Sequence, residues 1–563
     1  MARACSLAVR AVAACAVLAY LGLGKRVAVS WDIGYVADTR AGHTLRRAIG
    51  ANGMLPIPPV AATVGDTLEL TVHNSLDTTT TIHAHGLFQR NATYMDGPAM
   101  ATQCGIPPGA SFTYVYELDN AGTFWLHGHD HHQNSDGLRA PMIVHDKPGT
   151  EPFAYDQDIL LPVEDWFHDE FADRIKQTID PNATFPPPHG YASGLINGTD
   201  GDSTRPLRFE PGRTYRLRLI NMSALMWFQF SLPGHKLEVI EIDGEYTAPL
   251  SVDGIDIGPA QRYSVLVSAY PTVAANFVYN VTMHANFIPP TAGLTPRTYI
   301  GQVVYREGAP RAATIAPAHG SPDFQWLHDI ELQPLDGQPA LVPDRRISLE
   351  VGNLVYSTGQ HLDHINNITY TAPKVPTLLT ALSMGAAAAD PRVYGPQTNA
   401  VVLAHNEVVE LTVNNPGDLP HPLHLHGHTF QIIEVGPAMT QLKIPEEYQS
   451  TTVRCAGPFP PRRDTAVVPE YSYIKIRFRA DNPGVWFFHC HMDIHFAMGM
   501  AMVFVEAPDI LQQTLRVPQE MLDFCRARDI PIAGNAIGKS GLDFSGAPAV
   551  PTVVEPQPLK HPN

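Results

Sequence analysis

Charged residues are scarce in this sequence, and basic residues are scarcer than acidic ones. Charged side chains make up 17% of the 563 residues, against about 25% in an average soluble protein. Lysine and arginine number 38 against 55 acidic residues, which gives a formal net charge of −17. Because nucleic acids and anionic membranes attract basic surfaces, neither is expected as a partner.

Long apolar runs are also lacking. Arg3 and Arg10 precede the apolar stretch 11–24, which is shorter than the about 20 residues that a membrane-spanning helix needs. We therefore predict a secretory signal peptide over residues 1–26, with a signal anchor as the alternative, and no stable membrane span in the mature chain. The protein is expected to be secreted or at the cell surface, as a glycoprotein. Six Asn-x-Ser/Thr sequons agree with export: Asn91, Asn182, Asn197, Asn221, Asn280 and Asn367.

Cysteine is rare as well. Cys5 and Cys15 fall within the predicted signal peptide. In an oxidising compartment the others are expected to form a disulfide bond, but four cysteines can pair in three ways. The four that remain are Cys104, Cys455, Cys490 and Cys525.

Short alternating segments and turn-forming residues are abundant instead. The chain has 51 prolines and 43 glycines, and helical periodicity is limited to short stretches such as 167–177. Many short strands separated by Gly/Pro turns are typical of β-sandwiches, so the sequence predicts an all-β protein. Strand patterns that alternate apolar and polar residues occupy 66–74, 111–118, 214–221, 262–269, 408–415 and 473–480.

The two ends of the chain resemble each other. Residues 65–86 and 406–427 both contain a strand and a turn that lead to His-x-His-Gly, and residues 121–129 resemble 483–491. The first and last domains are therefore predicted to be copies of one sandwich, while the middle segment keeps the strand pattern without a His-x-His. The predicted boundaries are 27–148, 149–312 and 313–530 for the three domains, and 531–563 for a C-terminal tail.

The histidine motifs point to a metal centre. On a β-strand, residues i and i+2 face the same side, so each His-x-His can direct two imidazoles at one metal. One such pair could be a chance pair or a solvated turn, but four at corresponding positions of a duplicated module argue against both. The motifs are His83-Ala-His85, His127-Gly-His129, His421-Pro-Leu-His424-Leu-His426, and His489-Cys-His491 with His495.

The ligand types indicate copper. A thiolate with two imidazoles and a weak axial methionine is the ligand set of a blue-copper site. Cys490, His495 and Met500 supply three of these ligands, and His421 is the best candidate for the fourth. On a strand Cys490 faces away from its two histidine neighbours, so it would join this mononuclear site covalently to a second cluster. Eight imidazoles then remain, the number expected for three coppers: His83, His85, His127, His129, His424, His426, His489 and His491.

On these motifs the chain resembles the three-domain multicopper oxidases, the family of laccases, ascorbate oxidases and fungal ferroxidases. HPLHLHGH (421–428) and HCHMDIHFAMGM (489–500) fit the family pattern. HAHG (83–86) and HGH (127–129) differ from it between the histidines but lose no ligand. The resemblance spans roughly residues 28–508. It implies three cupredoxin-like Greek-key β-sandwich domains and four copper ions, one of type 1, one of type 2 and two of type 3.

The resemblance also implies a role for each ligand. Type 1 copper would take single electrons from the substrate, and the cluster would use them to reduce O2 to water. The metals carry the electrons, and the protein fixes the geometry of the metals. Type 1 copper would be held by His421, Cys490, His495 and Met500, type 2 by His83 and His424, and the type 3 pair by His85, His127, His129, His426, His489 and His491.

Two acids and two cysteines match further family positions. O2 reduction consumes protons, and Asp96 and Asp493 stand where the family places proton-supplying carboxylates. The alternatives are that Asp96 caps a turn and that Asp493 pairs with a surface cation. Cys104 and Cys525 match a disulfide bond that ties the C-terminal tail to the first domain, which would leave Cys455 as the odd thiol.

The electron donor is the harder question. In sequence the chain most resembles the fungal ferroxidases, in the segments 366–383, 462–468 and 480–491. Those enzymes bind Fe(II) with carboxylates near the type 1 histidines. They also carry a C-terminal membrane anchor, which we do not expect here because residues 551–563 are proline-rich and polar.

None of the three acids stands at its expected position. One position holds Gly417, with Asp418 one residue late, and segments 185–190 and 283–293 contain no acid. We therefore expect a secreted laccase-type oxidase that oxidises and couples small phenols or naphthols, in fungal pigment or secondary-metabolite synthesis. An axial methionine lowers the type 1 potential, which suits electron-rich phenols. The alternatives are a ferroxidase, an ascorbate-type oxidase and a catalytically silent copper-binding protein.

Overall fold

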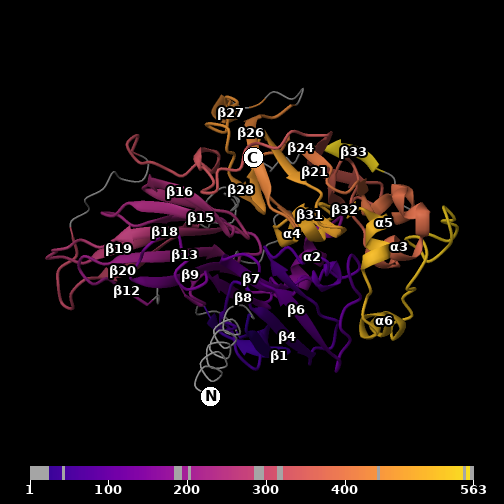
Figure 1. The fold of residues 1–563 in the computed structure, drawn as a ribbon, viewed down its shortest axis with the longest axis horizontal. Coiled ribbons are helices and arrows are strands. Elements are labelled where there is room, and N and C mark those ends of the chain that lie inside the picture. The colour runs from indigo at the N-terminus through magenta and orange to yellow at the C-terminus, as the bar shows by residue number, and fades with distance from the viewer. Residues whose placement is uncertain are drawn as a thin grey trace, which may run out of the picture.

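The computed structural model consists of three domains built from β-sheets (Figure 1). It describes residues 24–40, 45–182, 193–200, 205–283, 297–312, 321–439, 444, 446–548 and 553–557. The predicted signal peptide lies outside the described residues, apart from residues 24–26.

The helices of the described residues are short. None combines the length and the apolar character that a membrane span requires.

The first domain, indigo to violet in Figure 1, is a sandwich of two four-stranded sheets. Strands β5 and β7 pair antiparallel, which places His83 opposite His127. One sheet has the order β2 (Arg46–Ala51), β1 (Arg26–Asp38), β4 (Thr67–Asn74), β6 (Ser111–Glu117). The other has the order β3 (Val60–Thr63), β8 (Arg139–His145), β7 (Gly122–Gly128), β5 (Ile82–His85).

The second domain, magenta in Figure 1, packs a larger sheet against a five-stranded one. The larger sheet has the order β11 (Thr199–Asp200), β10 (Ser193–Ile196), β9 (Gln157–Trp166), β13 (Thr214–Asn221), β18 (Arg262–Ser268), β15 (Leu237–Ile242), β16 (Glu245–Val252). The smaller has the order β12 (Leu207–Arg208), β20 (Thr298–Val304), β19 (Phe277–Met283), β14 (Phe228–Ser231), β17 (Gly254–Ile257).

The third domain repeats the plan of the first. Its β25 and β31 pair antiparallel as β5 and β7 do, which places His424 opposite His489. The sheet that carries them has the order β23 (Ala400–Leu403), β32 (Ala501–Glu506), β31 (Gly484–Cys490), β25 (His421–Leu425), β29 (Thr465–Val468). The other has the order β22 (His361–Ile365), β21 (Arg345–Tyr356), β24 (Val408–Asn415), β30 (Ser472–Arg479), β26 (Phe430–Pro437), β27 (Val453–Arg454), with β28 (Arg462–Arg463) on β26 and β33 (Val553–Gln557) on β21.

The predicted fold class, three cupredoxin-like β-sandwich domains, is confirmed. All six alternating segments form strands, and in β4 and β30 alternate side chains are buried, as expected of a strand with one face on a core. By contrast, β5, β7, β25 and β31 are buried at every position. These four strands carry the histidine motifs, so the motifs lie in the interior rather than at the surface.

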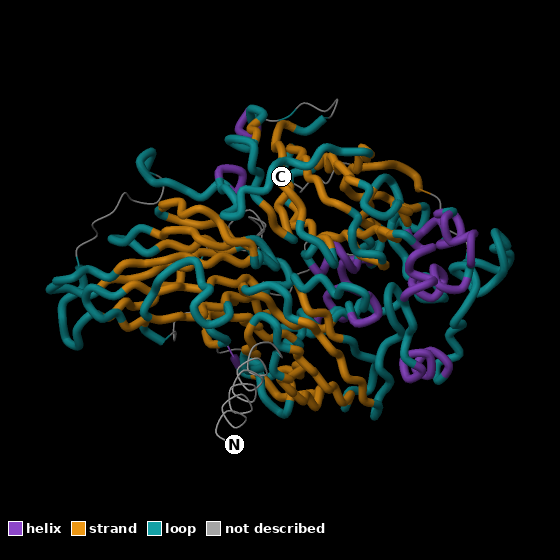
Figure 2. Tube along the Cα trace, in the orientation of Figure 1, coloured by secondary structure: helices purple, strands orange, loops and turns teal. Residues whose placement is uncertain are grey.

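Helices are few and gather mainly on one side of the third domain (Figure 2). Helix α2 (Phe171–Ile179) overlaps the predicted helical stretch 167–177. The other α-helices of the described residues are α4 (Asp493–Ala497), between β31 and β32, and α3 (Thr377–Ser383), α5 (Pro508–Thr514) and α6 (Gln519–Arg526).

The disulfide bond implied by the family resemblance is confirmed. Cys104 of the first domain is bonded to Cys525 of α6, with their Cα atoms 5.3 Å apart. Both cysteines are buried, in the apolar core of the first domain. Cys455 is a free, half-buried thiol.

Removing this disulfide bond should destabilise the protein. The bond closes a loop of 421 residues, and loss of a native disulfide destabilises a domain by about 2–5 kcal/mol because the unfolded chain gains freedom. We expect the double variant Cys104→Ala, Cys525→Ala to unfold at a lower urea concentration than the wild type. Tryptophan fluorescence measures the unfolding. Cys455→Ala, which removes a free thiol, is the control. Equal midpoints for the double variant and the wild type would contradict the expectation.

Candidate metal centres

Eight histidines from the first and third domains meet in one buried cluster. They come from β5 and β7 with the residue after β7, and from β25 and β31 with the residues after each. All are at most 8% exposed: His83, His85, His127, His129, His424, His426, His489 and His491. The structure thus brings together every residue that the sequence analysis placed in the second cluster.

Within this cluster the ring nitrogens gather in triplets. Each group offers three nitrogens that lie within 4.8 Å of one another. The Nε2 atoms of His426 and His489 are 3.1 Å apart, and the His491 ring centroid lies 5.0 Å from that of His85. The triplets are His83 with His85 and His127, His83 with His424 and His426, and His129 with His426 and His489.

The pattern of hydrogen bonds shows that the cluster suits metal ions. Several histidines use one ring nitrogen for a protein contact, as His83 Nδ1 does with the Asp96 carbonyl at 2.7 Å and His424 Nδ1 with the Asp464 carbonyl at 2.9 Å. An imidazole that donates its N–H in this way offers a lone pair on the other nitrogen. Among the described residues, these buried nitrogens have no hydrogen-bond partner: His83 Nε2, His85 Nδ1, His127 Nε2, His424 Nε2 and both nitrogens of His491.

The electrostatics favour neutral, ligating imidazoles. Burial, followed by the neighbouring histidines, lowers the pKa of His85 and His424 well below its usual value. The pKa of His489 falls to about 4, mainly through burial. A buried nitrogen left without a partner would destabilise the fold by about 1–3 kcal/mol, so these nitrogens are best explained as metal ligands. The donor set therefore fits copper.

A second group contains sulfur. The Nδ1 atoms of His421 and His495 are 3.1 Å apart. Cys490 Sγ lies 3.7 Å from the first and 3.6 Å from the second, and all three residues are buried. Met500 is fully buried in the same apolar cluster as Cys490, and its backbone bonds to both His495 and Cys490. This is the predicted set of a blue-copper site.

Helix α4 brings His495 back to the sulfur. The chain leaves β31 at Cys490, makes this short helix, and then turns at Gly499, whose φ is +104°. A Cβ atom at Gly499 would lie 2.3 Å from Thr369 Cγ2, so a side chain there is excluded by contact as well as by backbone conformation. The sequence pattern did not indicate this helix.

Cys490 lies between the two groups. In the pairing of β25 with β31, Leu423 is opposite Cys490 and His424 is opposite His489. Adjacent residues on a strand face opposite sides, so the thiol joins the sulfur-containing group while His489 and His491 join the eight-histidine cluster. The backbone connects the two groups covalently, as the sequence predicts.

Asp96 holds two of the cluster histidines. Its backbone carbonyl accepts from His83 Nδ1, and its Oδ2 lies 2.9 Å from His426 Nδ1. Burial raises the pKa of Asp96, and the nearby His83 acts in the opposite direction. Asp96 also ends a single helical turn, Thr93–Met95, with its backbone N–H, so it both ends a turn and contacts the cluster.

Asp493 lies at the junction of all three domains. Its Oδ2 accepts hydrogen bonds from Asn134 Nδ2 at 3.1 Å and from the Ser135 hydroxyl, both of the first domain. Its backbone N–H donates to the Ala224 carbonyl of the second domain at 2.8 Å. Burial raises its pKa to about 7. Its side-chain hydrogen bonds thus come from buried neutral groups, not from a surface cation.

Asp464 contacts two cluster histidines, and the sequence did not predict it as a site residue. Its Oδ1 lies 3.1 Å from His85 Nε2, and its carbonyl lies 2.9 Å from His424 Nδ1. Asp464 lies in the segment 462–468, which contributed only to the resemblance with the fungal ferroxidases. Asp464 stands 379 residues from His85 in the chain, and no spacing rule could connect them.

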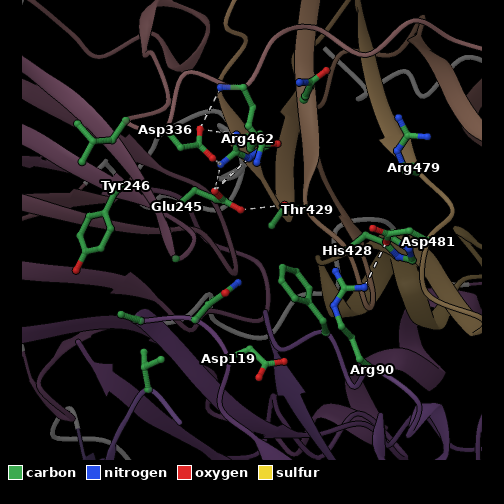
Figure 3. A pocket seen from close by; sticks show the side chains of 18 of the residues that line it. Arg90, Asp119, Glu245, Tyr246, Asp336, His428, Thr429, Arg462, Arg479 and Asp481 are labelled. Carbon is green, nitrogen blue, oxygen red and sulfur yellow. Dashed lines mark hydrogen bonds and ion pairs between the residues drawn. The ribbon is translucent and has the colours of Figure 1, made fainter. Parts of the chain in front are cut away.

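A polar cavity of about 840 Å³ lies where the three domains meet (Figure 3). Arg462, on its wall, pairs with Glu245 and Asp336. His428, also on the wall, is buried, and its Nε2 lies 3.0 Å from Glu506 Oε1. Since His428 is two residues from His426, the cavity reaches the segment that carries the cluster but is not itself lined by the cluster histidines.

Comparisons with known proteins agree with this geometry. Family models described as multicopper oxidase match residues 32–149, 157–302 and 370–509. The iron multicopper oxidase fer1 of Mycosarcoma maydis is 37% identical over 559 residues, 93% of this chain and 87% of that protein. The iron transport multicopper oxidase FET5 of Saccharomyces cerevisiae is 36% identical over 96% of this chain and 89% of that protein.

Solved structures are similar over most of the chain. Fet3p, described as a multicopper oxidase that functions in iron import, has a TM-score of 0.82 and 31% identity, over 96% of this chain and 100% of that one. A laccase from Botrytis aclada has a TM-score of 0.72 and 26% identity, over 90% and 92%.

These relatives correct the expected donor. The prediction of a laccase-type oxidase of small aromatic phenols or naphthols, acting in pigment or secondary-metabolite synthesis, is wrong. The similar curated proteins carry iron multicopper oxidase names, and Fet3p is more similar in structure than the laccase. The prediction depended on acids missing from three local positions. Two of these segments, 185–190 and 283–293, lie outside the described residues apart from Met283.

Proposed function

The chain belongs to the multicopper oxidase family, and from this premise we propose that it oxidises Fe(II) to Fe(III). It is a copper-dependent oxidoreductase with four copper ions as cofactors and O2 as electron acceptor. The proposed reaction is 4 Fe(II) + O2 + 4 H+ → 4 Fe(III) + 2 H2O, which balances in atoms and charge. We further propose that the chain is exported by the signal peptide predicted over residues 1–26.

For the copper ligands we propose the assignment that the family resemblance implies. His421, Cys490, His495 and Met500 would hold type 1 copper, and His83 with His424 type 2. The type 3 pair would be held by His85, His127, His129, His426, His489 and His491. When bound, these ions supply one-electron transfer and the reduction of O2.

The chain's own residues position and connect these ligands. Cys490 provides the link between the two sites, because His489 and His491 are its direct neighbours in the chain. Asp96 fixes the orientation of His83 and His426 through their Nδ1 atoms. Asp493, whose pKa burial raises to about 7, can hold a proton near the cluster at acidic pH, and we propose that it supplies protons for O2 reduction.

The observation that carries Fe(II) as donor is the similarity, over 91–96% of the chain, to proteins named for iron oxidation or iron transport. One acid beside a type 1 ligand in the chain offers a test, although it stands one residue from the position of the ferroxidase acid. Asp418 lies three residues before His421, partly buried in the loop between β24 and β25. A carboxylate at this place suits a divalent cation better than an apolar ring.

Fe(II) should be the preferred donor in O2-uptake measurements. We expect kcat/KM for Fe(II) to exceed that for simple phenols, polyhydroxynaphthalenes and ascorbate by at least about tenfold, equivalent to about 1.4 kcal/mol. Asp418→Asn should lower kcat/KM for Fe(II) while leaving a phenol unaffected. Asp119→Asn, at an exposed acid of the first domain, is the matched control. A higher kcat/KM for any organic donor than for Fe(II) would overturn the proposal.

A further inference from the structure

We propose that Arg262, in the domain that supplies no copper ligand, is a positioning residue for the eight-histidine cluster and acts on it through Asp464. The inference rests on the ligand assignment proposed above but not on the identity of the electron donor.

Asp464 holds two stacked imidazoles from different domains. The rings of His85 and His424 have centroids 3.8 Å apart and planes 17° from parallel. Asp464 contacts the outer nitrogen of each, His85 Nε2 through Oδ1 and His424 Nδ1 through its carbonyl. The inner nitrogens, His85 Nδ1 and His424 Nε2, have no protein partner within the part of the chain that the structure describes. Asp464, together with the Thr465 hydroxyl 3.2 Å from the same two nitrogens, therefore determines which nitrogen of each ring is offered to copper.

Arg262 holds Asp464 from the second domain. Its Nη1 donates to Asp464 Oδ1 at 2.8 Å and its Nη2 to Oδ2 at 2.6 Å. Such a two-pronged pair between a planar guanidinium and a carboxylate fixes orientation as well as distance. Arg262 is 0% and Asp464 1% exposed, so no solvent can replace either partner.

The guanidinium is itself fixed by the first two domains. Arg262 Nε donates to the Thr123 carbonyl of the first domain at 2.9 Å, and Nη1 to the Ala260 carbonyl of its own domain at 3.1 Å. Gly86, which follows His85 and has a φ of +92°, packs against this arginine: a Cβ atom there would lie 2.6 Å from Arg262 Nη2. The segment that carries His85 is thus placed against Arg262 directly as well as through Asp464.

A second ion pair, between Asp243 and Arg463, holds the segment around Asp464 against the second domain. Asp243 of the second domain accepts from Arg463 Nε at 2.9 Å and from the Thr465 backbone N–H at 3.2 Å. It also accepts from the backbone N–H of Arg262 at 2.9 Å. The residues on both sides of Asp464 are therefore bonded to the second domain.

This arrangement complements the one at Asp96. Within the described residues, Asp96 holds His83 and His426 with no hydrogen bond or ion pair to the second domain, whereas Asp464 holds His85 and His424 with such contacts. Type 2 copper would have His83 and His424 as its only protein ligands, so the contact through Asp464 supports half of its protein ligand set. Loss of a residue that orients a ligand weakens metal binding by about 10–100-fold. We therefore expect loss of Arg262 to affect type 2 copper most.

The test compares the copper-loaded full chain with Arg262→Met. We expect copper per chain to fall from four toward three, loss of the type 2 signal in electron paramagnetic resonance, and an unchanged blue absorption from type 1. The rate of O2 reduction should fall about a hundredfold. Arg262→Lys, which keeps the charge but not the two-pronged contact, should fall between Arg262→Met and the wild type.

Arg218→Met is the matched control. Arg218 belongs to the same sheet, is 1% exposed, pairs with Asp158 and reaches Thr123 of the first domain. Within the described residues, none of its contacts is to a residue bonded to a cluster histidine. This variant should keep four coppers and the type 2 signal.

Two outcomes would overturn the proposal. One is a full type 2 signal with four coppers in Arg262→Met, and the other is equal loss of type 2 copper in Arg262→Met and Arg218→Met. Should Arg262→Met fail to fold, Asp464→Asn removes the same ion pair with little change of shape and is judged by the same signals. Copper content and the type 2 signal do not involve the donor, so a failure of the Fe(II) proposal would appear separately, in the donor comparison.

Discussion

Replacing Cys490 by serine should abolish the blue absorption and lower O2 uptake by at least about a thousandfold, equivalent to about 4 kcal/mol in the barrier. The absorption should be lost because it arises from the bond between the thiolate and type 1 copper. Cys490 Sγ lies within 3.7 Å of both type 1 imidazoles in a fully buried site. A serine hydroxyl has nearly the same shape, but it lacks the soft sulfur that binds copper here. No other cysteine in the described residues can replace it, since Cys104 and Cys525 are bonded to each other and Cys455 lies elsewhere.

The same variant should retain the other coppers. Strand alternation directs His489 and His491 away from the type 1 site, so the eight-histidine cluster keeps its ligands when the thiol is lost. We expect three coppers per chain and an intact type 2 signal. Cys455→Ser, which changes the other free thiol, should leave colour and turnover as in the wild type. O2 uptake above about a tenth of the wild-type rate in Cys490→Ser would mean that electrons enter by another route.

Local patterns in the sequence predict much of the fold and the site. The six alternating segments form strands because period-two alternation places one face on a core wherever a sheet is half-buried. The two histidines of each His-x-His motif point to one metal centre because residues i and i+2 of a strand face the same side of the sheet. The duplication then predicts that β5 and β7 correspond to β25 and β31, and the pairing of His83 with His127 and of His424 with His489 agrees with this.

What the sequence does not reveal depends on contacts between distant segments. Arg262, Asp464 and His85 come from three domains, and their contact exists only once these domains pack together. Helix α4 has five residues, too few for a helical periodicity to be visible in the sequence. Its role, to bring His495 close to Cys490, is apparent only in the folded structure. The predicted electron donor is wrong because it depends on a few single positions. The missing acids, such as the one replaced by Gly417, favoured a phenol, whereas the resemblance over most of the chain is to iron oxidases.

Replacing Asp493 by asparagine should slow O2 reduction by about a hundredfold, because a positioned general acid contributes about 10²–10⁴-fold to a rate. Asparagine keeps the shape of the side chain and can still accept from Ser135 and Asn134, so the position of α4 should not change. It has no acidic proton to give. Burial keeps the pKa of Asp493 at about 7, well above that of an exposed aspartic acid, so the wild-type carboxyl retains its proton under acidic conditions.

Separating the two half-reactions identifies the step that Asp493 serves. Anaerobic bleaching of the blue absorption by Fe(II) should proceed at the wild-type rate in Asp493→Asn, since the type 1 ligands are unchanged. Return of the colour on mixing with O2 should be slow. Asp493→Glu, which restores an acid, should recover part of this rate, and Asp509→Asn, at the exposed acid near the start of α5, should have no effect. Because reduction by Fe(II) takes up no proton at the cluster, slowing confined to bleaching would show that Asp493 acts on type 1 through α4 and not on O2.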